Sequence, residues 1–581
     1  PGMPAALASL ALLGGFLHGA SACTVFAAGK LATADGSVLV SHSDDGDPSN
    51  DARLIYVPAA DHAPGSKRPI YYTPESFPRY VGSSLGPDYE PNDDTGPDVY
   101  KPVGFIDQVA HTFGYQDNTY GVVNEHGVSV GESTCGAMFG TCGAGSSIAC
   151  EPGRKVGVAL MSIDTLSQLA MERTTSARQA VELMGDFATK YGFYGPPDSF
   201  EGSGESLIVG DPEEAWAFQI LSDPTGTSAI WAAKRLPDTD VTVVANMFTI
   251  REVNASDKDN YILSPNIFSI AESQNWWKQG EPLDFTRMYS GGEYSHKYYT
   301  GRRMWGAFRL AAPSVSLPDE YEDIRYKPVY PWSLKPDKPV THRDFMKWHR
   351  DWYAGTKYDM TKGLQAGPFG SPDRFATTSK VKGNWERSIT LYRTNSVYVQ
   401  QLHRPAAGGS AGMASVAWFG SGPAHYTPFL PVPAGVTRTL HPLRFAAPKK
   451  FEWKSMNWAT RRVMDVCQIH WNKMHVLVEA AQKRIEDEGD ALVARLRTSA
   501  NASNPAVLNE AFEKHAKKAL SEWHRLALDM VFSYSDNSDI GNLTALSYPD
   551  EWLAGVGYED GPPDAPVEDQ CPPRCPRPAL V

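Results

Sequence analysis

The sequence has no hydrophobic run long enough to cross a membrane and no excess of positive charge. Its most apolar stretch, residues 7–17, contains 11 residues, whereas a membrane-spanning helix needs about 20. The 54 Lys and Arg residues are outnumbered by 67 Asp and Glu residues, which gives a net charge of −13. We therefore expect neither broad electrostatic binding to nucleic acid nor stable membrane insertion.

The patterns of metal and cofactor sites are also missing. The sequence contains no phosphate-binding glycine loop and no dinucleotide fingerprint. Residues 408–412 match G-x-S-x-G, but they link two predicted strands, 396–402 and 414–419, instead of a strand and a helix. His470 and His475 lack the glutamate of a zinc-peptidase helix, and residues 44–47 lack the ligands of a calcium loop. We expect no metal and no cofactor.

Cysteine is scarce, with seven residues among 581. Three lie in one Gly-rich segment and two in a Pro-rich tail, and neither group has the C-x-x-C spacing of a zinc site. These are Cys135, Cys142 and Cys150 in the first group, and Cys571 and Cys575 in the second. Setting Cys23 aside, six cysteines remain, which are compatible with up to three disulfides in an oxidising compartment.

The first 22 residues are typical of a secretory signal. Their apolar core is followed by Ala-Ser-Ala at residues 20–22, which places small residues where signal peptidase prefers them, although a basic segment before the core is missing. We predict cleavage after Ala22, and a short propeptide removed in another way is the alternative. The sequons at Asn254, Asn501 and Asn542 agree with a secretory route. We therefore expect a secreted or lumenal glycoprotein.

The rest of the chain has the composition of a folded globular protein, with 42% hydrophobic and 21% charged residues. Residues 23–250 are rich in short β-branched or apolar runs typical of strands, with a hairpin around residues 124–127 and one helical stripe at 167–191. Residues 251–450 read as Tyr- and Trp-rich strands and loops. Residues 455–533 are helical, and a Pro-rich tail begins near residue 556.

Cys23 is the most informative residue. Cleavage after Ala22 would make it the N-terminus, so that one residue carries both a thiol and a free α-amine. A thiol with a pKa of about 8.5 is weakly ionised at neutral pH, and an α-amine with a pKa of about 8 can serve as its base. The arrangement is that of an N-terminal nucleophile hydrolase, in which the thiolate attacks an amide carbonyl and water releases the thioester.

Short motifs along most of the chain support this interpretation. They resemble, in their order and in the position of the cysteine, the C69 dipeptidase family, an N-terminal nucleophile (Ntn) hydrolase family related to the choloylglycine hydrolases and penicillin V acylases. The matching segments are Cys23-Thr24, 29–37, 41–46, 120–128, 131–134, 172–178, 204–206, 211–216, 245–248, 264–266, 301–303 and 423–435.

The resemblance implies roles for individual residues. Cys23 corresponds to the nucleophile, Asp45 to the carboxylate that holds the α-amine, and Asn246 to an amide that donates toward the oxyanion. Arg302 corresponds to an active-site arginine, with the register open by one residue because Arg303 follows it. Asp45 also fits a solvated loop acid, and Asn246 a strand-capping turn residue.

Two positions depart from the family pattern, and one further residue is a candidate from its position alone. Thr134 stands where the acylases have a second oxyanion asparagine, so its backbone N–H or its hydroxyl is expected to substitute. His42 stands where many relatives have arginine; a partly buried strand histidine is the alternative. Glu132, on the strand after the hairpin, is the candidate for binding the free amino group of a dipeptide.

Together these observations predict an α+β fold, an Ntn-hydrolase αββα sandwich of two antiparallel sheets with insertions. The expected divisions are a signal or propeptide (1–22), the catalytic core (23–450), a helical region packed on it (451–555) and the tail (556–581). The predicted function is hydrolysis of small unblocked dipeptides, and self-association into a homo-oligomer is compatible with the sequence. An amidase acting on N-acyl amino acids or bile-salt-type amides, and a non-catalytic secernin-like regulator, are the alternatives.

Overall fold

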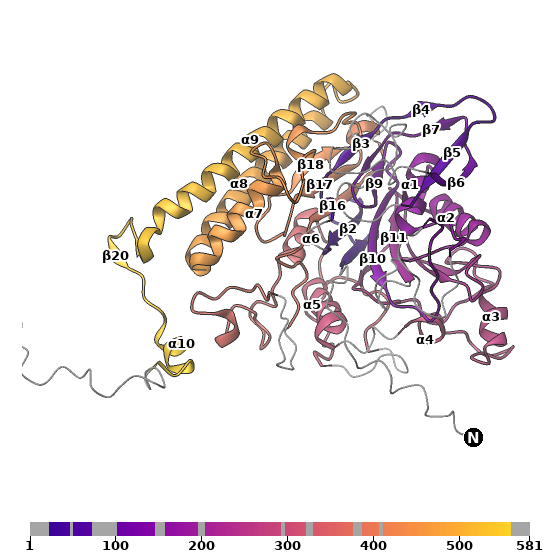
Figure 1. Cartoon of the computed structure of the whole chain (residues 1–581), viewed down its shortest axis with the longest axis horizontal. Helices are drawn as coiled ribbons and strands as arrows, with labels where there is room; N and C mark the ends of the chain where they lie inside the picture. The colour runs from indigo at the N-terminus through magenta and orange to yellow at the C-terminus, as the bar shows by residue number, and fades with distance from the viewer. Residues whose placement is uncertain are drawn as a thin grey trace, which may run out of the picture.

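The computed structural model describes residues 23–46, 50–72, 102–145, 157–195, 204–291, 297–320, 329–375, 386–405 and 411–558. Two antiparallel sheets form the centre of the molecule (Figure 1). The predicted segment 1–22, three of the cysteines (Cys150, Cys571 and Cys575), residues 408–410 of the G-x-S-x-G match and the tail from residue 559 lie outside these ranges.

The first sheet has six strands in the order β14-β1-β2-β16-β17-β18. Their bounds are β1 (Val25–Ala28), β2 (Val38–Asp44), β14 (Val241–Val244), β16 (Ser396–Leu402), β17 (Val416–Gly420) and β18 (Leu430–Pro433). Strand β2 lies between β1 and β16, with Ala27 opposite Val40 and Tyr398 opposite His42. The first residues after the predicted cleavage point are thus one strand from the centre of this sheet.

The second sheet has eight strands in the order β15-β13-β12-β11-β10-β9-β8-β3. Their bounds are β3 (Ile55–Val57), β8 (Tyr115–Asp117), β9 (Gly121–Asn124), β10 (Ser129–Cys135), β11 (Gly204–Gly210), β12 (Ala215–Ser222), β13 (Ala229–Arg235) and β15 (Tyr261–Leu263). The predicted hairpin is β9–β10, and its turn uses Gly127 at φ 82°. Short pairs flank the sheets: β4 (Ala60–Asp61) with β7 (His111–Thr112), β5 (Lys67–Tyr71) with β6 (Pro102–Asp107), and β19 (Ser538–Asp539) with β20 (Thr544–Ala545).

The two sheets pack face to face, and helices cover both outer faces (Figure 1). Helices α1 (Ile163–Arg173) and α2 (Ala177–Tyr191) lie on the eight-stranded sheet, and α5 (Arg302–Ala311) and α6 (His342–His349) on the six-stranded one. The smaller helices α3 (Ile267–Ser273) and α4 (Phe285–Tyr289) precede α5. The protein is therefore an α+β sandwich with two antiparallel sheets at its centre.

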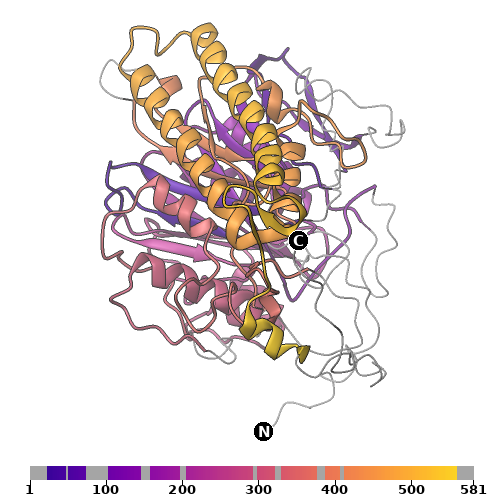
Figure 2. The ribbon, with the colours of Figure 1, turned by 90° about the vertical axis from the view of Figure 1, so that its left-hand side faces the viewer.

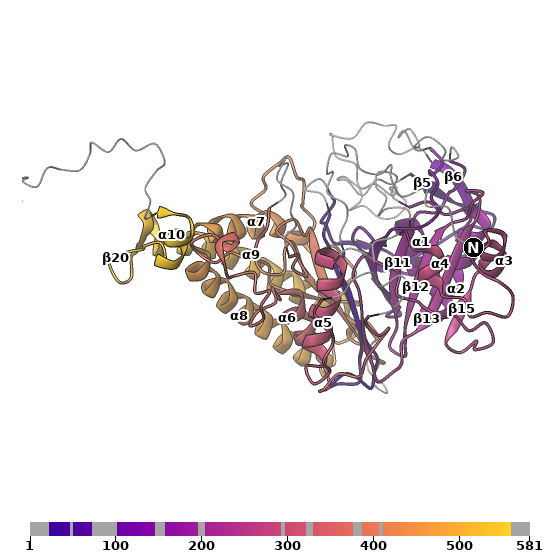
Figure 3. The same ribbon diagram turned by 90° about the horizontal axis from the view of Figure 1, so that it is seen from below.

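The C-terminal helices extend the layer that covers the first sheet. Helices α7 (Met456–Cys467), α8 (Trp471–Arg497) and α9 (Pro505–Ser533) pack on one another, and α8 and α9 contact β18 (Figure 2). Seen from below, these helices and α1–α2 stand on opposite sides of the sheets, and α10 (Asp550–Gly555) lies at the outer end (Figure 3). Among the described residues, no helix is long and apolar enough to span a membrane.

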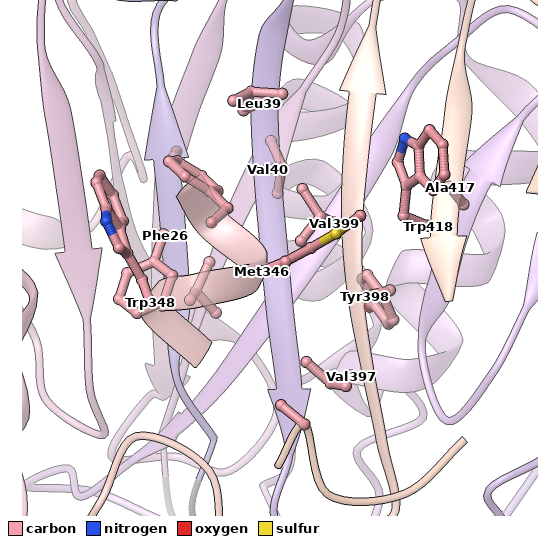
Figure 4. Packing of buried hydrophobic residues seen from close by; sticks show 14 of the residues in the cluster. Phe26, Leu39, Val40, Met346, Trp348, Val397, Tyr398, Val399, Ala417 and Trp418 are labelled. Atoms are coloured by element: carbon pink, nitrogen blue, oxygen red, sulfur yellow. The ribbon is translucent and has the colours of Figure 1, made fainter. Parts of the chain in front are cut away.

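Burial of large apolar side chains holds α6 against the first sheet (Figure 4). Phe26 of β1 makes edge contacts with Trp348 at 5.7 Å and with Phe345 at 5.8 Å between ring centres. Each of these rings is almost fully buried, and burying such a side chain contributes about 1.5–3 kcal/mol. Strand β1, which follows Cys23 in the chain, is therefore anchored in the main core.

The structure corrects two expectations about local structure. The helical stripe at 167–191 consists of two helices, because Thr174 ends α1 with its N–H bonded to Ala170 and Ser176 caps the start of α2. Residues 251–350 were expected to be strands and loops, yet they contain helices α3 to α6 and only one short strand, β15. Aromatic residues there pack in helices, for example Trp305 in α5 and Trp348 in α6.

Candidate active site

Cys23 lies between the two sheets, and three different elements fix its main chain. Its neighbour Thr24 pairs with Ser43 of β2, whose Oγ accepts a hydrogen bond from the Thr24 N–H at 3.2 Å. The Cys23 carbonyl accepts hydrogen bonds from Ser133 Oγ of β10 at 3.2 Å and from Arg303 Nη1 of α5 at 2.8 Å. The residue is fully buried.

A glycine lets β10 approach this position. A Cβ on Gly131 would lie 2.6 Å from the backbone oxygen of Ser41 and 3.0 Å from a methyl group of Val25. Any side chain at position 131 would therefore push β10 away from β1 and β2. The short Gly131–Ser133 segment thus brings Glu132 and Ser133 to the cysteine.

Of the two adjacent arginines whose register the sequence left open, Arg303 is the one that contacts Cys23. Arg303 contacts the Cys23 carbonyl and also donates to Thr24 Oγ1 at 2.9 Å and to Asn246 Oδ1 at 2.7 Å. Burial and the neighbouring Arg387 lower the pKa of Arg303 to about 10, so its guanidinium is still charged at neutral pH. Arg302, the residue named from the sequence, has other partners.

Arg302 belongs to a separate cluster. It donates to Glu386 Oε2 at 2.7 Å and lies over the ring of Tyr358, 3.3 Å from its centre. On a helix, adjacent residues point about 100° apart, so only one of the two arginines can face the sheets. Sequence alignment of the pair Arg302-Arg303 cannot decide which one does.

Asn246 follows β14 and lies beside Arg303. Its backbone has φ 53°, a left-handed conformation that asparagine tolerates better than most residues. Its N–H donates to Ser133 Oγ at 2.8 Å and its side-chain Nδ2 donates to the Thr134 carbonyl at 2.7 Å. Because an amide nitrogen carries two hydrogens, one remains for a ligand. Position and contacts are both compatible with the predicted donor role.

Asp45 is a buried acid rather than a solvated loop residue. Arg387 Nη2 donates to its Oδ2 at 2.5 Å, Thr394 donates to its Oδ1, and Ser43 Oγ lies 3.3 Å from Oδ2. Its side chain is fully buried. Arg387 supplies the opposite charge that a buried carboxylate requires.

His42 and Glu132 form a second polar group beside the cysteine. His42 Nε2 lies 3.5 Å from Glu132 Oε2, and Thr134 Oγ1 donates to Glu132 Oε1 at 2.8 Å. Burial disfavours the charged form of Glu132, but the interactions with His42 and Glu205 outweigh it, so the pKa of Glu132 lies below its usual value. The structure thus brings His42, Glu132 and Thr134 together.

The electrostatic surroundings keep the Cys23 thiol protonated. Burial raises its pKa well above the usual value, and the negative charges of Glu132, Asp44 and Asp45 raise it further. The thiol is therefore neutral at pH 7 in the described chain. It becomes a nucleophile only where a base takes its proton.

The other cysteines differ partly from the prediction. Cys135 and Cys467 are free, buried thiols, so neither takes part in the expected bridges, whereas Cys142 is disulfide-bonded. Both free thiols lie in apolar cores, where a reduced cysteine packs as a small hydrophobic residue. Three disulfides among the six cysteines are therefore excluded.

Sequence reasoning missed three contributors to this site. Ser133 lies inside a recognised segment but was not singled out. Its position two residues after Gly131, on the same face of β10, is the signal that could have found it. Arg387 and Thr394 lie outside every recognised segment and approach Asp45 only in the fold. No local pattern points to them.

Comparisons with known proteins agree with this geometry. A model of peptidase family C69 matches residues 106–484, which include Glu132, Asn246 and Arg303 but not Cys23. The chain belongs to peptidase family C69. As a member of this family it is a hydrolase of peptide bonds.

Relatives extend the similarity beyond that range. A "Probable dipeptidase" of Latilactobacillus sakei is 24% identical over 497 residues, which cover 84% of this chain and 89% of the relative. A "Probable dipeptidase" of Salmonella dublin is 24% identical over 66% of this chain and 74% of its own length. A "Probable dipeptidase B" of Streptococcus pyogenes serotype M1 is 23% identical over 77% of this chain and 79% of its own.

Proposed function

We propose that this C69 peptidase is a cysteine dipeptidase that acts after cleavage following Ala22, with Cys23 as both N-terminus and nucleophile. The observation that carries the proposal is the hydrogen bonding of the Cys23 carbonyl to Ser133 and Arg303. These contacts hold the residue by its carbonyl, so they persist when the peptide bond before Cys23 is cut. The names of the relatives favour dipeptides as substrates.

The raised pKa of the thiol supports the need for a built-in base. In the uncut chain the Cys23 nitrogen is an amide and accepts no proton, whereas a free α-amine has a pKa of about 8 and can take the thiol proton. The thiolate then attacks the peptide carbonyl, the amine returns the proton to the leaving group, and water hydrolyses the thioester. Asp45 would hold the amine, and the ion pair with Arg387 orients its carboxylate.

The developing oxyanion requires donors placed before the reaction. The second hydrogen of Asn246 Nδ2 and the backbone of Thr134 are the groups in the proposal, and a single such donor is worth about 100-fold or more in rate. Arg303 acts as a positioning residue, because it bonds Cys23 and Asn246 at once and so sets the distance between nucleophile and donor.

An unblocked dipeptide brings a positive α-ammonium group that must lose water on binding. Glu132, fully buried with its charged form favoured, is the acceptor that we assign to it, and His42 and Thr134 hold the carboxylate in place. A charge-assisted hydrogen bond of this kind is roughly twice as strong as a neutral one. N-acylated substrates lack the charge and are expected to be poorer.

Localisation follows from the same processing step. We propose that the signal at 1–22 directs the chain to a secretory or lumenal compartment, where cleavage creates the active terminus. The disulfide at Cys142 is compatible with an oxidising compartment.

The test combines the mature N-terminus with activity. We expect N-terminal sequencing of the natural protein to begin at Cys23. The Cys23→Ala variant should lose dipeptide hydrolysis. The matched control Cys135→Ala, which removes a buried thiol at the end of β10, should keep it. A mature protein that starts elsewhere, or full turnover by Cys23→Ala, would refute the mechanism. Faster hydrolysis of N-acyl amino acids than of free dipeptides would instead favour the amidase.

A further inference from the structure

Three groups whose chemistry suits a metal ion converge at the active site. The Cys23 thiol, a His42 ring nitrogen and a Glu132 carboxylate oxygen all lie within 4.8 Å of one another, and all three residues are buried. Both ring nitrogens of His42 and the Oε2 of Glu132 have no hydrogen-bond partner among the described residues. Buried polar atoms without partners are uncommon and call for a ligand.

The donor set and its spacing fit a zinc ion. Zinc binds thiolate at about 2.3 Å and imidazole or carboxylate at about 2.0–2.2 Å in a tetrahedron, which places neighbouring donor atoms about 3.3–3.7 Å apart. His42 Nε2 and Glu132 Oε2 already stand 3.5 Å apart. The remaining donor distances need to close by roughly 1 Å at most, within reach of side-chain rotation.

The charges around the site also favour a cation. The carboxylates of Glu132, Asp44 and Asp45 all act on Cys23, whereas Arg387 pairs with Asp45 and Arg303 bonds the Cys23 carbonyl. A thiolate and a glutamate carboxylate together balance the two charges of a zinc ion, and His42 binds as the neutral ring. Metal binding releases the thiol proton to solvent.

Maturation would add a fourth donor. A free N-terminal cysteine binds metal through both its sulfur and its α-amine, which closes a five-membered ring, whereas the amide nitrogen of the uncut chain is no ligand. We propose that the mature N-terminus, with Cys23 Sγ and its α-amine, His42 and Glu132, forms a zinc site whose occupation reversibly inhibits the peptidase. Zinc would cover the nucleophile and its base, the two groups that the reaction needs free.

The inhibition rests on the proposed function, but the binding can be measured separately. Cobalt(II) replaces zinc in such sites and, when bound by thiolate, gives a charge-transfer absorption in the near ultraviolet. We expect the processed wild-type protein to bind one cobalt ion with this absorption, zinc to displace it, and peptidase activity to fall in step with occupancy and to return with a chelator.

Variants identify the ligands without relying on activity. Cys23→Ser should lose the absorption, whereas Cys135→Ser, which removes another buried thiol, should keep it. Glu132→Gln and the uncut chain that retains residues 1–22 should each bind at least about tenfold more weakly, since each lacks one donor. Circular dichroism of each protein confirms that the fold is retained.

The outcomes separate the two proposals. An absorption that is absent from the wild type, or that is lost with Cys135→Ser and kept with Cys23→Ser, would overturn the zinc site. A chelated enzyme that is inactive and regains activity with zinc would overturn inhibition, because the metal would then be a cofactor. Full dipeptide turnover by Cys23→Ala would refute the proposed catalytic function and leave the cobalt measurement unchanged.

Discussion

Replacing Arg303 tests the site more directly than any other change outside the nucleophile. Arg303→Met keeps most of the length and volume of the side chain but removes its charge and its donors. It withdraws hydrogen bonds from the carbonyl of Cys23, from Thr24 and from the side chain of Asn246. It also leaves the Tyr299 carbonyl, 2.8 Å from Arg303 Nε, without this donor.

The magnitude follows from these contacts. Hydrogen bonds to a charged group contribute about 1.5–3 kcal/mol each, but removing a buried guanidinium also relieves its desolvation, so we expect a net loss of stability of about 2–4 kcal/mol. Loss of the link between Cys23 and Asn246 allows the nucleophile and the oxyanion donor to separate. Misplacement by about 1 Å costs on the order of 100-fold, so kcat/KM should fall by at least about 100-fold.

Arg302→Met is the matched control, on the same helix and one residue away. Arg302 pairs with Glu386 and lies over the ring of Tyr358, so we expect its kcat/KM to stay within about tenfold of wild type. The assay is dipeptide hydrolysis by purified protein whose mature N-terminus has been checked by mass spectrometry, with thermal unfolding to separate stability from activity. A large loss with Arg302→Met and none with Arg303→Met would refute the assignment.

Three further predictions concern neighbouring groups. Glu132→Gln should raise KM for free dipeptides far more than for N-acylated analogues, and equal effects in steady-state kinetics would contradict its role in binding the ammonium group. Arg387→Met should destabilise the fold by about 3–5 kcal/mol in urea unfolding because it leaves Asp45 buried and unpaired; adding Asp45→Asn should recover part of that loss, and strict additivity would count against the pair. Burial lowers the pKa of His475 to about 4, so stability should fall as the pH drops from about 6.5 to 4, by up to about 1.4 kcal/mol per pH unit, because the unfolded histidine takes up a proton and the native one does not. His475→Gln should flatten this slope in urea unfolding at several pH values, and an unchanged slope would show that His475 does not carry it.

The sheets could be predicted from sequence because their strands are short, largely apolar runs joined by recognisable turns. The β9–β10 hairpin and the β11–β12 pair follow directly from such patterns. Helices α3 to α6 could not, because their aromatic residues favour strands by propensity and are helical only through tertiary packing, as for Trp348 against Phe26.

The candidate site likewise contains some residues that the sequence indicates and others that only the fold brings into place. Cys23, Asp45 and Asn246 stand in segments whose order along the chain is informative, and they converge in the structure. Arg387 reaches Asp45 across 342 positions of sequence, and no spacing rule covers such a distance. The choice between Arg302 and Arg303 depends on helix rotation, which is set by what α5 packs against rather than by its own residues.

The proposed nucleophile at a chain terminus faces a particular physical difficulty, because terminal residues are usually frayed. This fold counters it by attaching Cys23 and Thr24 to both sheets and to a helix: Ser43 of the first sheet, Ser133 of the second and Arg303 of α5. None of these bonds uses the Cys23 nitrogen, so cutting the chain before Cys23 frees the amine without releasing the residue. The same attachments explain why the polar groups around Cys23 lie in the core rather than in a surface loop. Precise placement of a terminal thiol requires partners on both sides, and the space between the two sheets offers them.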